Sequence, residues 1–154
     1  MPTTLDAIDR RILQALQRDA RIQNTDLADI AGLSPSPCLR RVRLLEETNV
    51  IERYVALLRP AAVGLHMTLF VRVTLERQGQ ASVENFAEEI QLVPQVLECH
   101  LMAGSYDFLL RVAVADLEDY RRLQQKYIAS IKGVRNVQTE IPLQKIKLTT
   151  ELPV

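Results

Sequence analysis

The stretch "LSPSPCLRRVRLLEE", residues 33–47, contains two prolines and yet predicts a helix. Proline inside a helix costs about 3 kcal/mol, because it lacks an N–H group and its ring clashes with the preceding turn. If Ser34 is the N-cap, Pro35 and Pro37 fall in the first turn, where the backbone N–H groups have no partner within the helix. The prolines therefore predict a stiff helix that begins at Pro35.

The helix behind the prolines has an apolar face and a basic face. Cys38, Val42 and Leu45 recur at intervals of four and three residues, which places them on one face. The side chains that point away from it are those of Ser36, Pro37, Arg40 and Arg43. Arginines and acidic residues balance over residues 1–53, but no acidic residue occurs from Ser34 to Leu45. Any attraction for a polyanion must therefore be local to this helix.

The residues upstream predict that this helix is the second half of a helix-turn-helix motif. Asn24 suits the N-cap of a short helix, and Gly32 suits the left-handed residue that ends it. An earlier apolar stripe runs from Leu5 to Leu16, in a helix that is expected to start at Asp6 with Asp9 three residues on, a pair typical of a capping box. We expect three helices over residues 1–53, the last of which enters the major groove of double-stranded DNA.

Six residues of the last helix are predicted to contact DNA. They are Ser34, Ser36, Pro37, Arg40, Arg41 and Arg43. The cap and first turns of such a helix touch bases and phosphates, and the planar guanidinium of arginine binds guanine or phosphate through two hydrogen bonds. Arg41 can instead serve an ion pair within the domain. The alternative for the whole basic face is that it is simply solvated. Helix-turn-helix look-alikes also occur in enzymes, so the motif alone does not establish DNA binding.

Composition sets broad bounds. The chain has 154 residues, of which 47% are hydrophobic and 25% charged, with a formal net charge of zero. This is enough for one medium domain or two small ones. We expect no membrane segment and no secretory signal, hence a cytoplasmic protein, and the two distant cysteines predict reduced thiols rather than a disulfide framework.

The second half of the chain predicts a different, α+β domain. Residues 50–60, "VIERYVALLRP", favour a strand and residues 61–64, "AAVG", a turn, so residues 54–65 are expected to be a linker. Within residues 66–154, strands are expected at 67–75, 96–103, 106–114 and 134–147, with helices around 83–90 and 117–131. The similar strands "LFVRVTL" and "FLLRVAV" indicate two βαβ halves, as in a ferredoxin-like sandwich. One face of such a sheet is bare and partly apolar, which predicts a homodimer.

Two segments carry a resemblance to a known family. Residues 5–47, "LDAIDRRILQALQRDARIQNTDLADIAGLSPSPCLRRVRLLEE", and residues 102–112, "MAGSYDFLLRV", are similar to the Lrp/AsnC (feast/famine) family of prokaryotic transcription regulators. The resemblance implies a winged helix-turn-helix domain, a strand hinge and a RAM-type ferredoxin-like effector domain. It also implies that the protein dimerises and builds larger rings, often octamers.

The resemblance further implies a small effector, usually an amino acid, that binds between dimers. The residues implied in effector binding are Met102, Gly104, Ser105, Tyr106, Asp107 and Thr139. The loop residues themselves fit this role, because Gly104 can offer a backbone nest to a carboxylate and Asp107 can accept from an ammonium group. The alternative is an ordinary hairpin turn, which uses the same residue types.

No catalytic residue, cofactor or metal is expected. Cys99 and His100 are adjacent in a predicted strand, so their side chains point to opposite faces and cannot readily act as a pair. The cysteines and histidines lack the spacing of zinc ligands. Two alternatives remain open: an enzyme resembling the tetrapyrrole decarboxylases that share this two-part architecture, and an architectural DNA-coating protein without an effector.

Overall fold

The computed structural model describes residues 4–154, which divide into two compact units. The first unit contains the residues up to Leu57 together with Ile146–Val154, and the second contains Leu58–Lys145. The chain therefore passes between the units twice. Residues 146–154 belong to the helical unit, although the sequence assigned them to the second domain. Within residues 4–154, no helix is long and apolar enough to cross a membrane.

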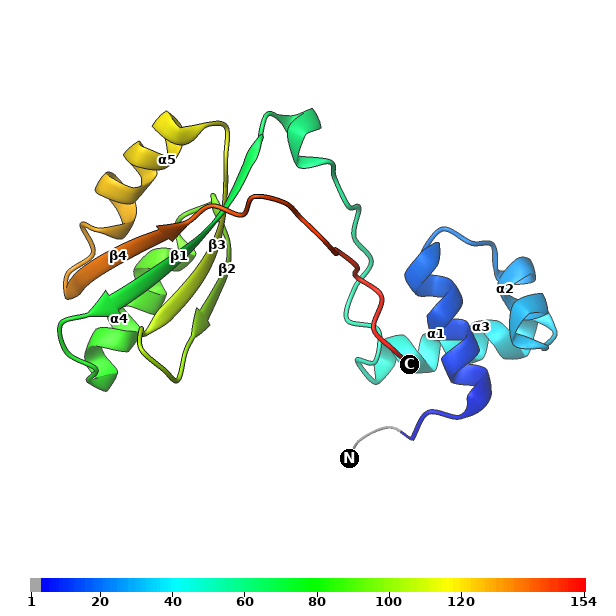
Figure 1. Ribbon diagram of the computed structural model, residues 1–154. Coiled ribbons are helices and arrows are strands. Elements are labelled where there is room, and N and C mark those ends of the chain that lie inside the picture. The colour runs from blue at the N-terminus through cyan, green and yellow to red at the C-terminus, as the bar shows by residue number, and fades with distance from the viewer. Residues whose placement is uncertain (1–3) are drawn as a thin grey trace. The chain divides into compact units, whose positions relative to one another are not determined.

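The first unit is built on three helices, α1 (Ala7–Arg18), α2 (Asn24–Ala31) and α3 (Pro35–Glu47) (Figure 1). All three contribute to one small core. The buried side chains of this core are Ile12, Leu13, Leu27, Ala28, Ala31, Cys38 and Leu45. The apolar face predicted for α3 is thus the face that packs against α1 and α2.

The helix ends follow the predicted chemistry with one exception. The Asp6 carboxylate accepts from the N–H groups of Ile8 and Asp9, and the Asp9 carboxylate accepts from the N–H of Asp6, which completes a capping box. Gly32 ends α2 with φ 73°. Asn24 is not the N-cap of α2, because Gln23 occupies that position; the Asn24 side chain instead donates to the carbonyl of Pro35 at 2.9 Å and so links α2 to the start of α3.

The start of α3 explains how the helix accommodates its prolines. Ser34 is the N-cap, as predicted, and the first helical bond runs from the N–H of Cys38 to the carbonyl of Ser34. Pro35 and Pro37 precede this bond. Neither proline therefore removes a backbone hydrogen bond from the helix.

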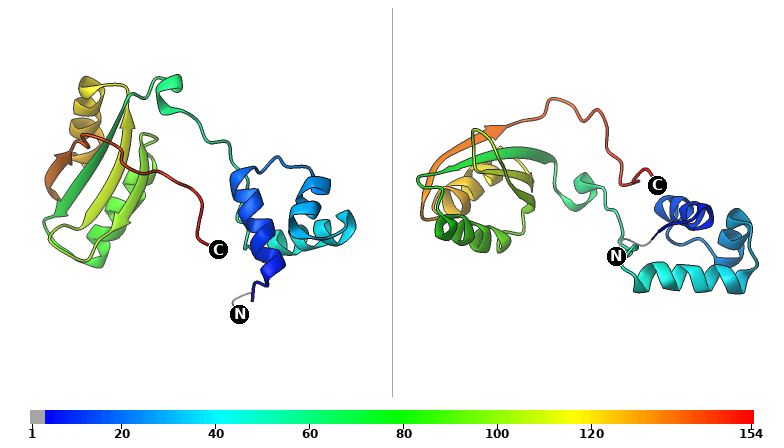
Figure 2. Two further views of the ribbon diagram at one scale, coloured as in Figure 1. Left: turned by 45° about the vertical axis from the view of Figure 1, so that its right-hand side comes forward. Right: turned by 90° about the horizontal axis from the view of Figure 1, so that it is seen from below.

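The second unit is a ferredoxin-like sandwich. A short 3₁₀ helix (Pro60–Val63) precedes β1 (Met67–Leu75), α4 (Gln80–Gln91), β2 (Val96–Leu101), β3 (Phe108–Val114), α5 (Leu117–Leu123) and β4 (Val134–Glu140). The strands pair antiparallel in the order β2-β3-β1-β4. Both helices lie on one face of this sheet and leave the other face open (Figure 2). A π-helical turn, Gln124–Ile128, continues α5.

The core of this unit lies between the sheet and its helices. Leu69, Val71, Val73 and Leu75 alternate along β1 with less buried residues, and Phe86 of α4 stacks on Phe108 with ring centroids 4.4 Å apart. The alternation predicted for β1 is confirmed, and so is the order of strands and helices.

Two predicted strands differ clearly from the structure, and two more are shorter by two residues at the hairpin: β2 ends at Leu101 rather than at residue 103, and β3 begins at Phe108 rather than at residue 106. Residues 52–59 form no strand, because apolar residues alone do not make one without a hydrogen-bonding partner. The exposed fractions of Val55 and Leu57 are 61% and 72%. The last strand ends at Glu140 rather than at residue 147, just before Pro142, which cannot donate to a sheet.

The open face of the sheet is more polar than predicted. Arg72 pairs with Glu140 and Arg111 with Glu98, each at 2.6 Å. His100 lies 3.6 Å from the other oxygen of Glu98. Phe70 and Leu109 add large apolar side chains beside these charges, so the face combines ion pairs with apolar side chains. The shift of register between Val96 and Glu98 also places Val96 on the helix-covered side, against Val112.

Candidate DNA interface and effector loop

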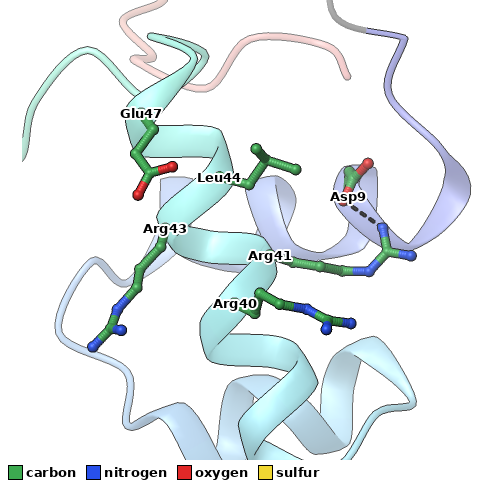
Figure 3. A pocket seen from close by; sticks show the side chains of 6 residues that line it. All are labelled: Asp9, Arg40, Arg41, Arg43, Leu44 and Glu47. Carbon is green, nitrogen blue, oxygen red and sulfur yellow. Dashed lines mark hydrogen bonds and ion pairs between the residues drawn. The ribbon is translucent and has the colours of Figure 1, made fainter.

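The exposed face of α3 presents two arginines that make no ion pair within residues 4–154. Arg40 and Arg43 are both exposed. Together with neighbouring side chains they border an open cavity of about 510 Å³ (Figure 3). The residues that line it are Asp9, Arg40, Arg41, Arg43, Leu44 and Glu47.

Arg41 differs from its neighbours because it faces α1. One of its terminal nitrogens donates to Asp6 Oδ2 and to Asp9 Oδ1, each at 2.7 Å. The Asp6 carboxyl has a lowered pKa, chiefly because it accepts the N–H of Asp9 and then because it accepts from Arg41. The intradomain role considered for Arg41 is therefore the one that the structure shows, and α3 is fastened to the capping box of α1.

The free arginines diverge from one another. In Figure 3, Arg43 points to one side of α3, whereas Arg40 points to the side on which Arg41 meets Asp9. Two guanidinium groups separated in this way can reach two different phosphates or bases. Glu47 borders the same cavity one turn after Arg43, which limits the basic surface toward the end of the helix.

The first turn of α3 is accessible at the positions that the sequence favoured. Ser34 and Ser36 are exposed, and the Ser34 hydroxyl makes no capping hydrogen bond, so it is available to another partner. Pro37 is partly buried. Leu39 and Leu44, two apolar side chains that are exposed on the same helix, were not singled out from the sequence. Both positions lie outside the apolar face of α3, and this was the signal that could have identified them as exposed apolar residues.

The hairpin between β2 and β3 holds most of the predicted effector residues. Gly104 and Ser105 are exposed at its tip, and Met102 and Tyr106 are partly buried. The N–H of Met102 donates to the carbonyl of Asp107 at 2.8 Å, which closes the hairpin.

Asp107 has a structural partner. It is only 6% exposed, its Oδ2 accepts the N–H of Leu75 at 2.7 Å, and its own N–H donates to the carbonyl of Val73. The carboxylate therefore fastens the hairpin to the end of β1. Only its other oxygen has no hydrogen bond within the described residues.

Gly104 does not have the left-handed backbone that a nest for a carboxylate uses. Its φ lies outside the positive range, and a Cβ atom built on it would meet nothing within 4 Å. Residue 104 therefore does not have to be glycine: its backbone is not left-handed, and there is room for a side chain.

Tyr106 and Thr139, the remaining predicted residues, have different partners within one chain. The Tyr106 ring lies over the Arg72 guanidinium, 4.9 Å from its centre, which holds the tyrosine against the sheet. Thr139 lies on β4, opposite Val71, and its hydroxyl bonds to that of Tyr120 on α5 rather than to the hairpin.

Cys99 and His100 are not arranged as a nucleophile and base. In the register of β2 with β3, Cys99 lies opposite buried Leu110 and His100 opposite Leu109, so the two side chains lie on different faces. Desolvation raises the pKa of the Cys99 thiol, which disfavours the reactive thiolate. Among residues 4–154, no three His, Cys, Asp or Glu side chains are grouped as metal ligands.

A helix-turn-helix unit with a basic exposed helix, joined to a ferredoxin-like unit with a polar hairpin, defines a DNA-binding regulator with a ligand-binding domain. The family comparisons agree. Residues 5–52 match the model of winged helix-turn-helix DNA-binding domains, and residues 68–152 match the Lrp/AsnC ligand binding domain. The chain belongs to the Lrp/AsnC family of transcription regulators.

Individual relatives extend this similarity over nearly the whole chain. The leucine-responsive regulatory protein of Escherichia coli K12 is 39% identical over 148 residues, which is 96% of this chain and 90% of that protein. A regulator of Neisseria meningitidis solved with L-methionine is 38% identical with a TM-score of 0.93, and the match covers 97% of both chains. The feast or famine regulatory protein of Mycobacterium tuberculosis, also complexed with L-methionine, is 31% identical with a TM-score of 0.86, over 97% of this chain and 99% of that one.

Proposed function

We propose that α3 reads an operator in the major groove through Arg40 and Arg43, with Ser34, Ser36 and Pro37 placed against the DNA at the start of the helix. The observation that carries this proposal is the contrast among three neighbouring arginines. Arg41 is held by two carboxylates of α1, whereas Arg40 and Arg43 are exposed and make no ion pair within residues 4–154. Arg41 acts on DNA indirectly, by fixing the pose of α3.

Gel-shift titrations with an operator fragment test this assignment. Arg40→Ala and Arg43→Ala should each weaken binding by about 1–3 kcal/mol if the arginine reads a base. If an arginine touches only phosphate, specific and non-specific binding should fall alike. Arg135→Ala is the matched control, because Arg135 is exposed on β4 in the other unit. Unchanged affinity in both α3 variants, with the fold intact by circular dichroism, would exclude α3 as the reading helix.

The effector we propose is an amino acid bound at the hairpin tip between dimers. Two of the similar structures contain L-methionine, and the matched domain is a ligand-binding domain. Met102, Gly104, Ser105 and Tyr106 supply accessible groups. Asp107 serves mainly to position the hairpin, with its free oxygen as a candidate acceptor for the ammonium group, and Thr139 joins the site only from another subunit.

A thermal-shift screen with the twenty amino acids tests effector binding. A ligand at a hundred times its dissociation constant should stabilise the folded protein by about 2.7 kcal/mol. The active amino acid should lose this effect in Tyr106→Ala. If none of the twenty raises the melting temperature, the protein fits the alternative of an architectural DNA-binding protein.

We propose that the protein forms a homodimer, that dimers build larger rings such as octamers, and that the protein works in the cytoplasm. The proposed function involves no cofactor, metal or catalytic step. A two-fold dimer brings two recognition helices to half-sites about one helical turn apart. Cys99 and His100 lie on different faces of the sheet and so do not form a nucleophile–base pair.

A further inference from the structure

Residues 151–154 lie against α1 in the helical unit, although they follow the second unit in the chain. The Gln17 side chain makes two hydrogen bonds with Leu152: its Nε2 donates to the carbonyl at 3.1 Å, and its Oε1 accepts the backbone N–H at 2.6 Å. Gln14 Nε2 donates to the carbonyl of Val154 at 2.7 Å. Arg18 lies 3.6 Å from Glu151.

The contact recognises extended backbone rather than a side chain. The Gln17 amide offers one donor and one acceptor, and it satisfies both backbone groups of a single residue as a neighbouring strand would. The Leu152 side chain is 70% exposed and adds little. Val154 is the apolar anchor, since it is partly buried against the core of the three helices.

We propose that this face of α1, formed by Gln14, Gln17 and Arg18, is a binding site for an extended peptide, and that residues 151–154 are its ligand. The bound segment acts as a second, detachable tether of the DNA-binding unit. The other connection, residues 52–59, has no secondary structure and exposed apolar side chains, although the Tyr54 hydroxyl donates to Glu46 of α3 at 2.8 Å. Beyond Tyr54 this connection constrains the DNA-binding unit weakly.

The weakness of the individual contacts and the high local concentration of the segment together favour a tether that binds and releases reversibly. The bonds of Gln14 and Gln17 are exposed to water, where each hydrogen bond contributes little net free energy. The segment is part of the same chain, however, so its effective concentration near α1 is high and a weak site suffices to hold it.

The consequence for DNA binding rests on the proposed dimer. With both segments bound, the two DNA-binding units of a dimer reach a narrow range of half-site spacings. When the segments are released, each DNA-binding unit is connected through residues 52–59 alone, and the two units of a dimer can then bind half-sites over a wider range of spacings.

The first arm of the test measures the peptide site without DNA. Leu152→Pro removes the N–H that donates to Gln17, and Leu148→Pro is the matched control, because Leu148 is exposed in the same segment. In ¹H–¹⁵N spectra, the Gln14 and Gln17 side-chain amides should shift in Leu152→Pro and keep wild-type positions in Leu148→Pro. The peptide TELPV, residues 150–154, should restore the shifts in a chain lacking 151–154, and TEPPV should not. Identical amide positions in all chains would overturn the site.

The second arm measures affinity for paired half-sites whose spacing is changed stepwise. Wild type and Leu148→Pro should prefer one spacing by about fivefold or more, whereas Leu152→Pro and Gln17→Ala should differ less than about twofold among spacings. Affinity for a single half-site should stay unchanged. If the side-chain amides shift but the dependence of affinity on half-site spacing stays unaltered, the tether is overturned. If the wild-type protein fails to bind DNA, the proposed function is overturned, and the first arm still decides whether the peptide site exists.

Discussion

At the scale of single residues, three arginines within four positions have different surroundings, because Arg41 is held by two carboxylates whereas Arg40 and Arg43 make no ion pair within residues 4–154. Arg41 meets the capping box of α1, and this explains an expected dependence of stability on pH. The folded pKa of Asp6 is lowered, so its contribution to stability is fully present above the unfolded value of about 3.9 and is lost as pH falls through the folded value.

Replacing Arg41 should reduce that dependence. Arg41→Met removes both ion pairs while keeping the aliphatic part of the side chain, so the free energy of unfolding at pH 7 should fall. The loss of stability between pH 5 and pH 2 should become smaller than in wild type. Urea unfolding of both proteins across this pH range measures the effect. Parallel stability curves would show that the ion pairs do not stabilise the unit.

Asp107 shows that a side chain expected at a ligand can be a structural support. Asp107→Ala leaves the buried N–H of Leu75 without an acceptor, so we expect a loss of about 1–3 kcal/mol in the free energy of unfolding. Asp107→Asn keeps an acceptor oxygen and should lose clearly less. Denaturant unfolding of the two variants distinguishes them, and equal stability of Asp107→Ala and wild type would contradict the structural role.

The local sequence predicts some of these residue roles and not others. The Asp6 and Asp9 capping box and the left-handed Gly32 were predictable, because both depend on bonds within a few residues. The partner of Asp107 was not, since Leu75 is distant in sequence and meets the hairpin only through the pairing of β1 with β3. Gly104 misled for the opposite reason: glycine permits a positive φ but does not require one.

At the scale of elements, the prolines of α3 should stabilise the protein through the unfolded chain. Pro35 occupies the first helical position, where it costs no backbone bond and restricts the unfolded state. Pro35→Ala should therefore lower the free energy of unfolding by about 0.4–1 kcal/mol. Leu39→Pro, placed after the first helical bond, should cost about 3 kcal/mol. Thermal unfolding compares the two, and a stabilising Pro35→Ala would show that the helix start is strained.

The elements also show what periodicity alone can predict. β1 was predicted to the residue, because it lies in the middle of the sheet and its alternating side chains are buried on one face. Residues 50–60 have similar apolar content but no partner strand, so the same reasoning failed there. A strand is defined by its neighbour, and the sequence of one segment does not contain that neighbour.

At the scale of the whole molecule, the return of residues 146–154 to the helical unit was the feature least accessible to sequence. A glutamine that binds backbone leaves no side-chain pattern in the segment that it binds. The division into a DNA-binding half and an effector half, by contrast, followed from a change of period, from helical to alternating, near residue 60.

The open face of the sheet is where we expect the second copy to bind. Its charges are balanced, since Arg72 and Arg111 pair with Glu140 and Glu98, so two copies can meet there without net repulsion. Arg111 holds the pKa of the Glu98 carboxyl below its usual range, which keeps this pair ionised near neutral pH. Leu109 lies between Arg72 and His100 and offers an apolar contact at the centre of the face.

The dimer predicted from this face can be tested by one charge in the full-length protein. Leu109→Arg places a second guanidinium beside Arg72 on each copy, and the two-fold relation brings these groups toward one another, so we expect monomers at micromolar concentration. Leu92→Arg makes the same exchange at the end of α4, where the leucine is 83% exposed, and should leave the dimer intact. Light scattering gives the mass, and circular dichroism confirms the fold. A dimer that survives Leu109→Arg would place the interface on another surface, because the added guanidinium has an arginine and not a carboxylate directly opposite it.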